Sequence, residues 1–115
     1  MAISQAMCTS FKVQLLNGIH AFSTTVARAD TTADTFKVAL YTSSASLGAT
    51  TTAYGTSNEV TGTNYTAGGN TLSVVAPTSS STTAFLDFSD TTWSSATITA
   101  NGALIYNDTQ GDKAV

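Results

Sequence analysis

The sequence has few of the residues that carry out chemistry. Among 115 residues it has four Lys or Arg and seven Asp or Glu, with His20 and Cys8 the single examples of their types. Catalysis in soluble enzymes depends on groups that titrate, coordinate metals or act as nucleophiles. The composition therefore favours a structural or binding role over an enzymatic one. We expect no catalytic residue, no cofactor and no metal.

Positive charge is scarce and dispersed. The net charge is −3, and Lys12, Arg28, Lys37 and Lys113 are far apart in the sequence. Nucleic-acid binding requires clustered cations that replace phosphate counterions, so no nucleic-acid partner is expected. A single cysteine cannot form an intrachain disulfide, and Cys8 lies in an apolar stretch where we expect a small core residue.

Long apolar runs are absent as well. No segment approaches the roughly 18 apolar residues that a membrane-spanning helix requires. Residues 1–17 lack the basic start and the unbroken apolar run of a signal peptide. We therefore expect no membrane partner and synthesis in a cytoplasm.

Serine and threonine, by contrast, make up about a third of the chain. Five phenylalanines, four tyrosines and Trp93 argue against general disorder, because disordered chains are poor in aromatic residues. A chain of this length buries about two-thirds of its unfolded surface, which is enough for one domain over residues 1–115. Threonine is branched at the β-carbon and suits a pleated, half-exposed surface, so the composition favours β-structure.

Residues 1–18 carry the one helical pattern. Apolar side chains recur there every four residues, at Ile3, Met7, Phe11 and Leu15. This spacing places them on one helix face, with Ser4 able to cap the start and Asn17-Gly18 able to end the helix. The helix is expected either to pack on the chain's own sheet or to act as an arm. In the second case the first three of these residues form an interface with a neighbouring subunit.

Several segments alternate with a period of two, as half-buried strands do. They are residues 36–42, Leu72 to Ala76, Ala84 to Phe88, 97–99 and 103–106. Pro77 is expected to end the second strand because it cannot donate to a sheet ladder. Asn101-Gly102 predicts a hairpin turn between the last two strands. The pattern indicates a mainly β single domain, a β-sandwich or a jelly-roll-like barrel, with one N-terminal α-helix.

A long polar region, residues 43–70, separates the first two predicted strands. It contains Tyr54, Tyr65 and the pair Gly68-Gly69. Connections of this length are usually functional or mobile. The region is expected to be either an excursion without a role or a contact loop in which the two tyrosines anchor a partner.

The sequence offers only weak candidates for reactive or metal sites. His20 has no nucleophile motif near it, and a lone histidine is usually a packed or surface residue. Asp87 and Asp90 flank Phe88, but alternation directs Asp87 to solvent, and Asp90 suits a turn. Residues 107–112 resemble a calcium loop in composition, but they lack its alternating ligands and terminal glutamate.

Three groups of residues carry a resemblance to a known class. They are residues 34–45, residues 58–60 together with 65–69, and residues 86–88 together with Trp93, Ile98 and 102–107. Across most of residues 3–115 the chain resembles a group of small tailed-bacteriophage proteins encoded among virion genes. The shared motifs are structural, so the resemblance assigns no functional residues. Proteins of this group continue for another strand or two, which implies either an incomplete C-terminus here or a partner that completes the sheet.

The resemblance implies a virion structural protein made in the host cytoplasm. A capsid decoration or cement protein is expected, because sheet edges without blunting residues are best covered by symmetric neighbours. The alternatives are a neck or tail component, such as a fibre or adaptor with a recognition loop, and a carbohydrate-active β-domain. The expected partners are copies of the chain and other virion proteins, either the major capsid protein or tail and neck proteins. Candidate interface residues are Ile3, Met7, Phe11, Tyr54 and Tyr65.

Overall fold

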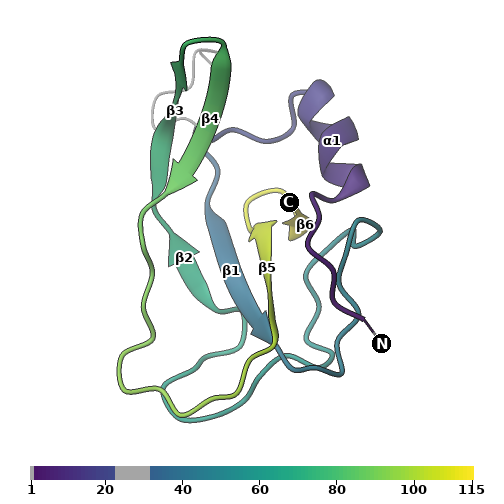
Figure 1. Cartoon of the computed structure of the whole chain (residues 1–115), viewed down its shortest axis with the longest axis vertical. Coiled ribbons are helices and arrows are strands. Elements are labelled where there is room, and N and C mark those ends of the chain that lie inside the picture. The colour runs from purple at the N-terminus through teal and green to yellow at the C-terminus, as the bar shows by residue number, and fades with distance from the viewer. Residues whose placement is uncertain (1, 23–31) are drawn as a thin grey trace.

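The computed structural model describes residues 2–22 and 32–115. Its elements are α1 (Thr9–Leu16), β1 (Phe36–Tyr41), β2 (Asn70–Leu72), β3 (Val74–Ser80), β4 (Thr83–Phe88), β5 (Gly102–Asn107) and β6 (Lys113–Ala114). One antiparallel sheet has the strand order β2-β1-β5-β6, and β3 and β4 form a separate hairpin (Figure 1). The chain is thus a mainly β domain with one N-terminal helix, as the sequence predicts.

The sheets are not closed into a barrel in the described part of the chain, so the barrel alternative is wrong. Closure requires continuous pairing around the whole sheet. Here β2 has three residues and β6 has two, and pairing with β1 stops at Leu72. After Ser73 the chain enters β3, which pairs only with β4.

Strand β1 lies at the centre of the larger sheet and agrees with the strand predicted over residues 36–42. It pairs with β2 on one side and with β5 on the other. Phe36 and Val38 are buried on one face, and Ala39 and Tyr41 are buried on the other. A strand that is covered on both faces therefore organises two apolar layers.

The helix is shorter than the sequence predicts. Phe11 is 4% exposed, but Met7 and Leu15 are about half exposed, so the expected four-residue stripe is not a buried face. Residues 2–8 form an extended arm, in which the Ser4 amide donates to the Leu47 carbonyl at 2.9 Å instead of Ser4 capping a helix. Cys8, which precedes the helix, is buried as expected. Hydrogen bonds to a distant loop have therefore overridden the helical spacing.

Two turn predictions are also wrong. Pro77 lies inside β3, where the pairing register shifts between Val75 and Thr78. A bulge of this kind leaves a backbone group unpaired, so the missing proline N–H costs little. The Asn101-Gly102 pair forms no hairpin, because Gly102 begins β5 and the segment 97–99 makes only one bridge, from Thr97 to Thr63.

The core has an aromatic layer on one face of the sheet. Phe22 stacks on Phe36 with ring centroids 4.3 Å apart, and Phe88 of β4 contacts both rings. The ring of Phe11 in α1 lies edge-on to that of Phe22, with centroids 5.9 Å apart. The centroid of Phe11 is 4.8 Å from that of the His20 ring. These contacts fix both α1 and the hairpin over one end of the sheet (Figure 1).

Candidate functional site

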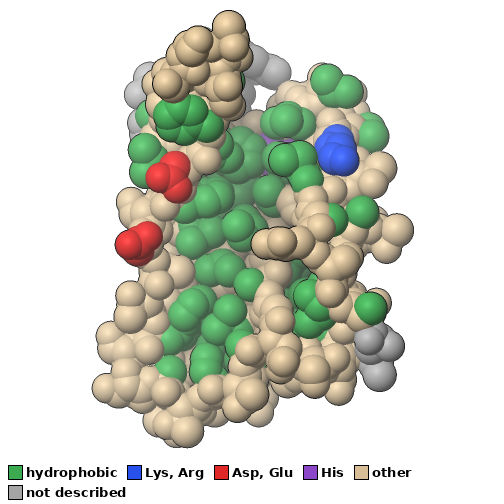
Figure 2. Space-filling view, viewed as in Figure 1, with side chains coloured by type: hydrophobic (Ala, Val, Ile, Leu, Met, Phe, Trp, Pro, Cys, Tyr) green, Lys and Arg blue, Asp and Glu red, His purple; other side chains and the backbone are tan. Residues whose placement is uncertain are grey.

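Next to this aromatic layer the sheet face stays apolar, and within the described ranges it is partly exposed. Val38 lies opposite Ile105 and Leu40 lies opposite Ala103, so all four side chains are on the face that carries Phe36. Leu40 and Ile105 are partly exposed and Ala103 is exposed. We call Val38, Leu40, Ala103 and Ile105 the open face. Figure 2 shows hydrophobic side chains gathered in a broad hollow over these strands, between the hairpin and α1.

The hairpin and α1 flank the hollow as its two walls, and both expose apolar side chains; those of the hairpin named below are on its side that does not pack on the sheet. On the hairpin, Val75 and Phe85 are 43% and 46% exposed. Val75 pairs with Asp87, so alternation places Val75, Phe85 and Asp87 on the side of the hairpin opposite to Phe88. On the other wall, Leu16 of α1 is 91% exposed. A two-stranded hairpin is marginal alone, so exposed apolar groups on it indicate a contact surface.

The charges on these walls have opposite signs. Figure 2 shows acidic side chains on the hairpin side of the hollow and one basic side chain over α1. Asp87 belongs to β4, Asp90 follows it, and Lys12 is the one cation of α1. All three are exposed. In the described ranges, Lys37 Nζ forms an ion pair with Asp108 Oδ1 at 3.4 Å. Lys37 lies between Phe36 and Val38 in β1, so its side chain is on the opposite face of the sheet from the open face.

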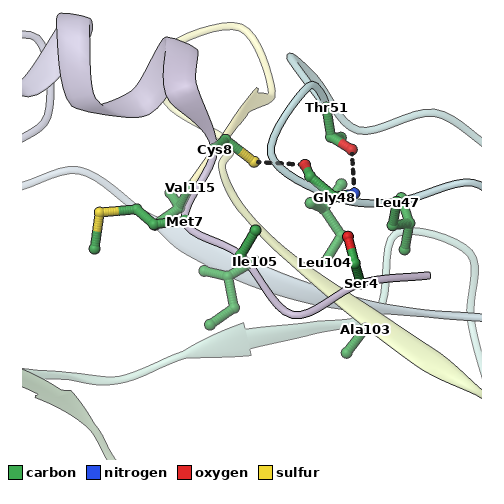
Figure 3. Close-up of a pocket in the computed structure, with 11 residues that line it drawn as sticks. Ser4, Met7, Cys8, Leu47, Gly48, Thr51, Ala103, Leu104, Ile105 and Val115 are labelled. Carbon is green, nitrogen blue, oxygen red and sulfur yellow. Dashed lines mark hydrogen bonds between the residues drawn. The ribbon is translucent and has the colours of Figure 1, made fainter.

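The open face continues into a pocket of about 310 Å³ at the outer edge of β5 (Figure 3). Its walls come from the arm, the turn around Gly48, and β5. Its lining residues are Ala6 and those labelled in Figure 3, which are Ser4, Met7, Cys8, Leu47, Gly48, Thr51, Ala103, Leu104, Ile105 and Val115. The Cys8 thiol donates to the Gly48 carbonyl at 3.7 Å, and burial raises the pKa of the thiol. The pocket therefore has an apolar lining and a thiol that stays protonated.

A buried carboxylate organises the opposite side of the sheet. Glu59 is 9% exposed and accepts hydrogen bonds from the Tyr54 and Tyr65 hydroxyls, at 2.8 and 2.7 Å, and from the Gly68 amide at 2.7 Å. The Tyr65 hydroxyl also accepts the Leu40 amide of β1 at 2.9 Å. The part of the long polar region from Tyr54 to Gly68 is therefore an ordered layer that Glu59 ties together and that Tyr65 joins to β1.

Tyr54 and Tyr65 lie within this layer, and Tyr41 of β1 and Tyr106 of β5 lie against it. Burial raises the pKa of each of these four tyrosines. For Tyr54 and Tyr65 the hydrogen bond to Glu59 adds to the effect of burial. Burial raises the pKa of Tyr106 to about 12, and that of Tyr41 also rises. Tyr54 stacks on Tyr106 with centroids 4.6 Å apart. Folding therefore favours the neutral form of these phenols.

A second polar cluster surrounds His20, which is 8% exposed. Asn107, fully buried, donates to His20 Nδ1 at 2.9 Å and to Asp34 Oδ2 at 2.8 Å. Asp34 also accepts the Ala21 amide at 2.9 Å and the Gln110 side chain at 3.1 Å. The hydrogen bonds of these side chains are made to one another, so the cluster ties residues 20 and 21 to Asp34, just before β1, and to Asn107 of β5.

The predicted interface residues separate in the structure. Met7 is exposed beside the pocket, and Ile3 packs against the position where Gly102 would carry a Cβ. Phe11 lies in the core, and the hydroxyls of Tyr54 and Tyr65 are held by Glu59. Their role as contacts stays a prediction. Sequence reasoning missed the exposed side chains of Val75 and Phe85. Both are apolar residues at positions where the alternation of their strands predicts a polar residue, and this departure could have indicated them.

Metal-binding clusters of His, Cys, Asp or Glu are absent from residues 2–22 and 32–115. Asp87 accepts the amide of its neighbour Phe88 at 2.8 Å. Asn107, within the calcium-like segment, belongs to the His20 cluster. In the described part of the chain, no helix has the length and apolar character that a membrane crossing requires.

The chain matches no family model, no curated protein and no solved structure.

Proposed function

We propose that this chain is a structural subunit of a tailed-bacteriophage virion, a decoration or cement protein of the capsid. The observation that carries the proposal is the open face, an apolar hollow with exposed apolar walls on a domain that has few charges. Contiguous apolar surface of this kind marks a site of protein association. Residues 34–45, 65–69 and 102–107 resemble small virion proteins, and this resemblance is the reason for proposing a phage particle as the assembly that the chain joins.

The polar clusters support a structural role. His20 and Asp34 are engaged with Asn107, and Glu59 is engaged with two tyrosines and a backbone amide. Groups with satisfied hydrogen bonds hold loops in place, because breaking any one of them leaves a buried polar atom unpaired. Neither cluster leaves a free nucleophile beside a base. We propose that the chain has no catalytic activity.

A neck or tail position is the second candidate, and the ordering of residues 54–68 favours it. A loop that is already held in one conformation loses little entropy when it binds, which suits a recognition surface. Its exposed side chains are largely hydroxyls and amides, from Thr61 and Thr63 to Asn64. Such groups can hydrogen-bond to a partner without charge.

The copy number per particle tests both positions. Purified particles of the phage that encodes this chain are analysed by quantitative mass spectrometry against the major capsid protein. Copies in the hundreds support the capsid, and a handful support the neck or tail. Absence of the chain from particles that contain all other structural proteins would overturn the virion proposal.

A further inference from the structure

The outer edge of β5 presents unpaired backbone groups beside the pocket. Leu40 and Ala103 lie opposite each other in the β1–β5 ladder. The amide of Leu40 donates to the Tyr65 hydroxyl and its carbonyl accepts the Val60 amide, so neither group points towards β5. In an antiparallel ladder, the backbone groups of two opposed residues point either both towards the partner strand or both away from it. The N–H and C=O of Ala103 therefore point away from β1, towards the outer edge of β5.

Strand β6 covers only the part of this edge that is close to Asn107. It pairs with Tyr106 and Asn107, and after it the Val115 amide donates to the Ile105 carbonyl at 2.9 Å. Further along the edge, the N–H and C=O of Ala103 have no hydrogen-bond partner among the described residues, and Ala103 is exposed. An unpaired donor and acceptor at the edge of a sheet are a template for another strand.

The pocket lies where such a strand would run. Residues 103–105 of β5 form one wall, and residues of the arm from Ser4 to Cys8 form the other (Figure 3). Val115 also lines the pocket, so a strand in line with β6 would enter it. The lining residues carry no charged side chain, and the volume is about 310 Å³. This volume is at the lower limit for ligand pockets, so it suits a segment of a few residues and not a folded element.

We propose that this pocket binds a short extended segment of another polypeptide, which adds to the edge of β5 as an antiparallel strand in line with β6. The backbone of the segment pairs with the N–H and C=O of Ala103. Its side chains are uncharged, because the lining offers no group that could neutralise a buried charge. In this mode of recognition, main-chain hydrogen bonds supply affinity and the pocket for the side chains supplies specificity.

The proposal goes beyond the virion role and does not depend on it. Strand addition is measured on the purified chain, whereas virion membership is measured on particles. A chain that binds no extended peptide but is present in particles would remove strand addition and leave the virion proposal standing. A chain that binds the peptide but is absent from particles would do the reverse.

Amide hydrogen exchange of the purified chain, resolved by residue with NMR, tests the free edge. The Ala103 amide should exchange at least about tenfold faster than that of Leu104, although the two are neighbours in the same strand. The reason is that Leu104, which lies opposite Ala39, points its N–H into the β1 ladder. Equal protection of the two amides would mean that the edge of β5 is already covered, and this result would overturn the proposal.

The binding probe is the blocked peptide acetyl-Thr-Val-Thr-Val-Thr-amide, which has residues of high β propensity and no charge. At saturation it should slow the exchange of the Ala103 amide at least about tenfold. The control peptide has Glu in place of both Val residues and should bind at least about tenfold more weakly, since its charges would enter an uncharged pocket. The absence of saturable binding up to about 5 mM of the Val peptide would overturn the proposal.

Two substitutions at Ala103 separate strand addition from binding elsewhere. Ala103→Pro removes the outward N–H, and the β1 ladder does not use this group, so an edge position tolerates the proline. This variant should bind the Val peptide about tenfold or more weakly than the parent chain. Ala103→Ser keeps the N–H and should bind within about threefold of the parent chain. A circular dichroism spectrum like that of the parent verifies that both variants are folded. A peptide that binds Ala103→Pro with undiminished affinity, or that leaves the exchange of the Ala103 amide unchanged, uses another surface, and the proposal is then wrong.

Discussion

The side-chain amide of Asn107 donates to Nδ1 of His20 at 2.9 Å, which fixes the tautomer of the only histidine in the chain. The orientation of this amide is set by Asp34, because the same nitrogen donates to Asp34 Oδ2 at 2.8 Å. His20 Nδ1 must therefore accept, and Nε2 carries the proton and donates to Gln14 Oε1 at 2.9 Å. A protonated His20 would present a second donor to Asn107.

We accordingly expect the fold to lose stability under mildly acidic conditions. Burial lowers the pKa of His20 below its usual 6.5; nearby Asp34 opposes this effect and Lys113 adds to it. The unfolded chain thus binds a proton at a higher pH than the folded chain does. The contribution of His20 is fully present above about pH 6.5 and is lost as the pH falls from there through the folded pKa. Urea unfolding between pH 7.5 and 5.5 measures this loss.

The control for that measurement is His20→Gln, which removes the titration and can still hydrogen-bond to Asn107. Its free energy of unfolding should change less over the same pH interval than that of the parent chain. Equal slopes in the two proteins would show that His20 does not couple protonation to stability.

Tyr54 and Tyr65 allow a matched comparison around Glu59. Both hydroxyls donate to this carboxylate, but only that of Tyr65 also accepts the amide of Leu40 in β1. Tyr54→Phe should cost about 1.5–3 kcal/mol, the loss of one hydrogen bond to a charged group. Tyr65→Phe should cost roughly 1–2 kcal/mol more, because it also leaves a strand amide without its acceptor. Chemical denaturation of the two variants gives the difference, and equal costs would contradict the role of Leu40.

Alkaline titration examines the same layer as a whole. Burial raises the pKa of all four tyrosines, to about 12 for Tyr106, against the usual value near 10. The neutral phenols are therefore favoured by folding. Their stabilising contribution is full below about pH 10 and is lost as the pH rises through the folded pKa values. Absorbance of tyrosinate should stay low in the folded chain near pH 10, where the urea-unfolded chain is half ionised. Half ionisation of the folded chain at that pH would show that the layer is open to water.

The strands were predictable from sequence where a face is buried by local alternation. Residues 36–41 and 102–107 carry apolar side chains that pack on the core, whereas in 83–88 the alternation is present although only Phe88 reaches the core. This signal needs no knowledge of the rest of the chain. The arm was not predictable. Ile3 and Met7 have helical spacing, but the arm pairs with the loop at Leu47, more than forty residues away.

The site was less accessible to sequence reasoning than the fold. Tyr54 and Tyr65 were identifiable as residues with a role, but the partner that explains them, Glu59, is one carboxylate in a hydroxyl-rich loop without any motif. Asp34 and Asn107 are 73 positions apart and meet only after the sheet has formed. Long-range hydrogen bonds leave no periodic pattern in a single sequence.

Phe11 and Met7 test the corrected account of the N-terminal segment. Phe11 contacts the rings of Phe22 and His20, so Phe11→Ala should cost roughly 3–5 kcal/mol, the range for core aromatic truncations. Met7→Ala should cost less than about 1 kcal/mol, because this side chain is 54% exposed. Thermal unfolding compares the two. Similar losses of stability in the two variants would indicate that Met7 and Phe11 are both buried on one helix face, as their spacing predicts.

Gly69 provides the sharpest local test of how the long loop meets the sheet. Its φ is +73°, and a Cβ at this position would overlap the carbonyl of Val38 in the central strand. Neither backbone can move without breaking the β1–β2 ladder, where Val38 pairs with Asn70. Gly69→Ala should therefore cost about 4 kcal/mol or more, in the range of exceptional single substitutions. Gly55→Ala is the matched control, since a Cβ there would meet nothing within 4 Å, and it should be neutral or stabilise by up to about 1 kcal/mol. Chemical denaturation of both variants measures the contrast, and a tolerated alanine at position 69 would mean that the loop does not approach β1 as closely as described.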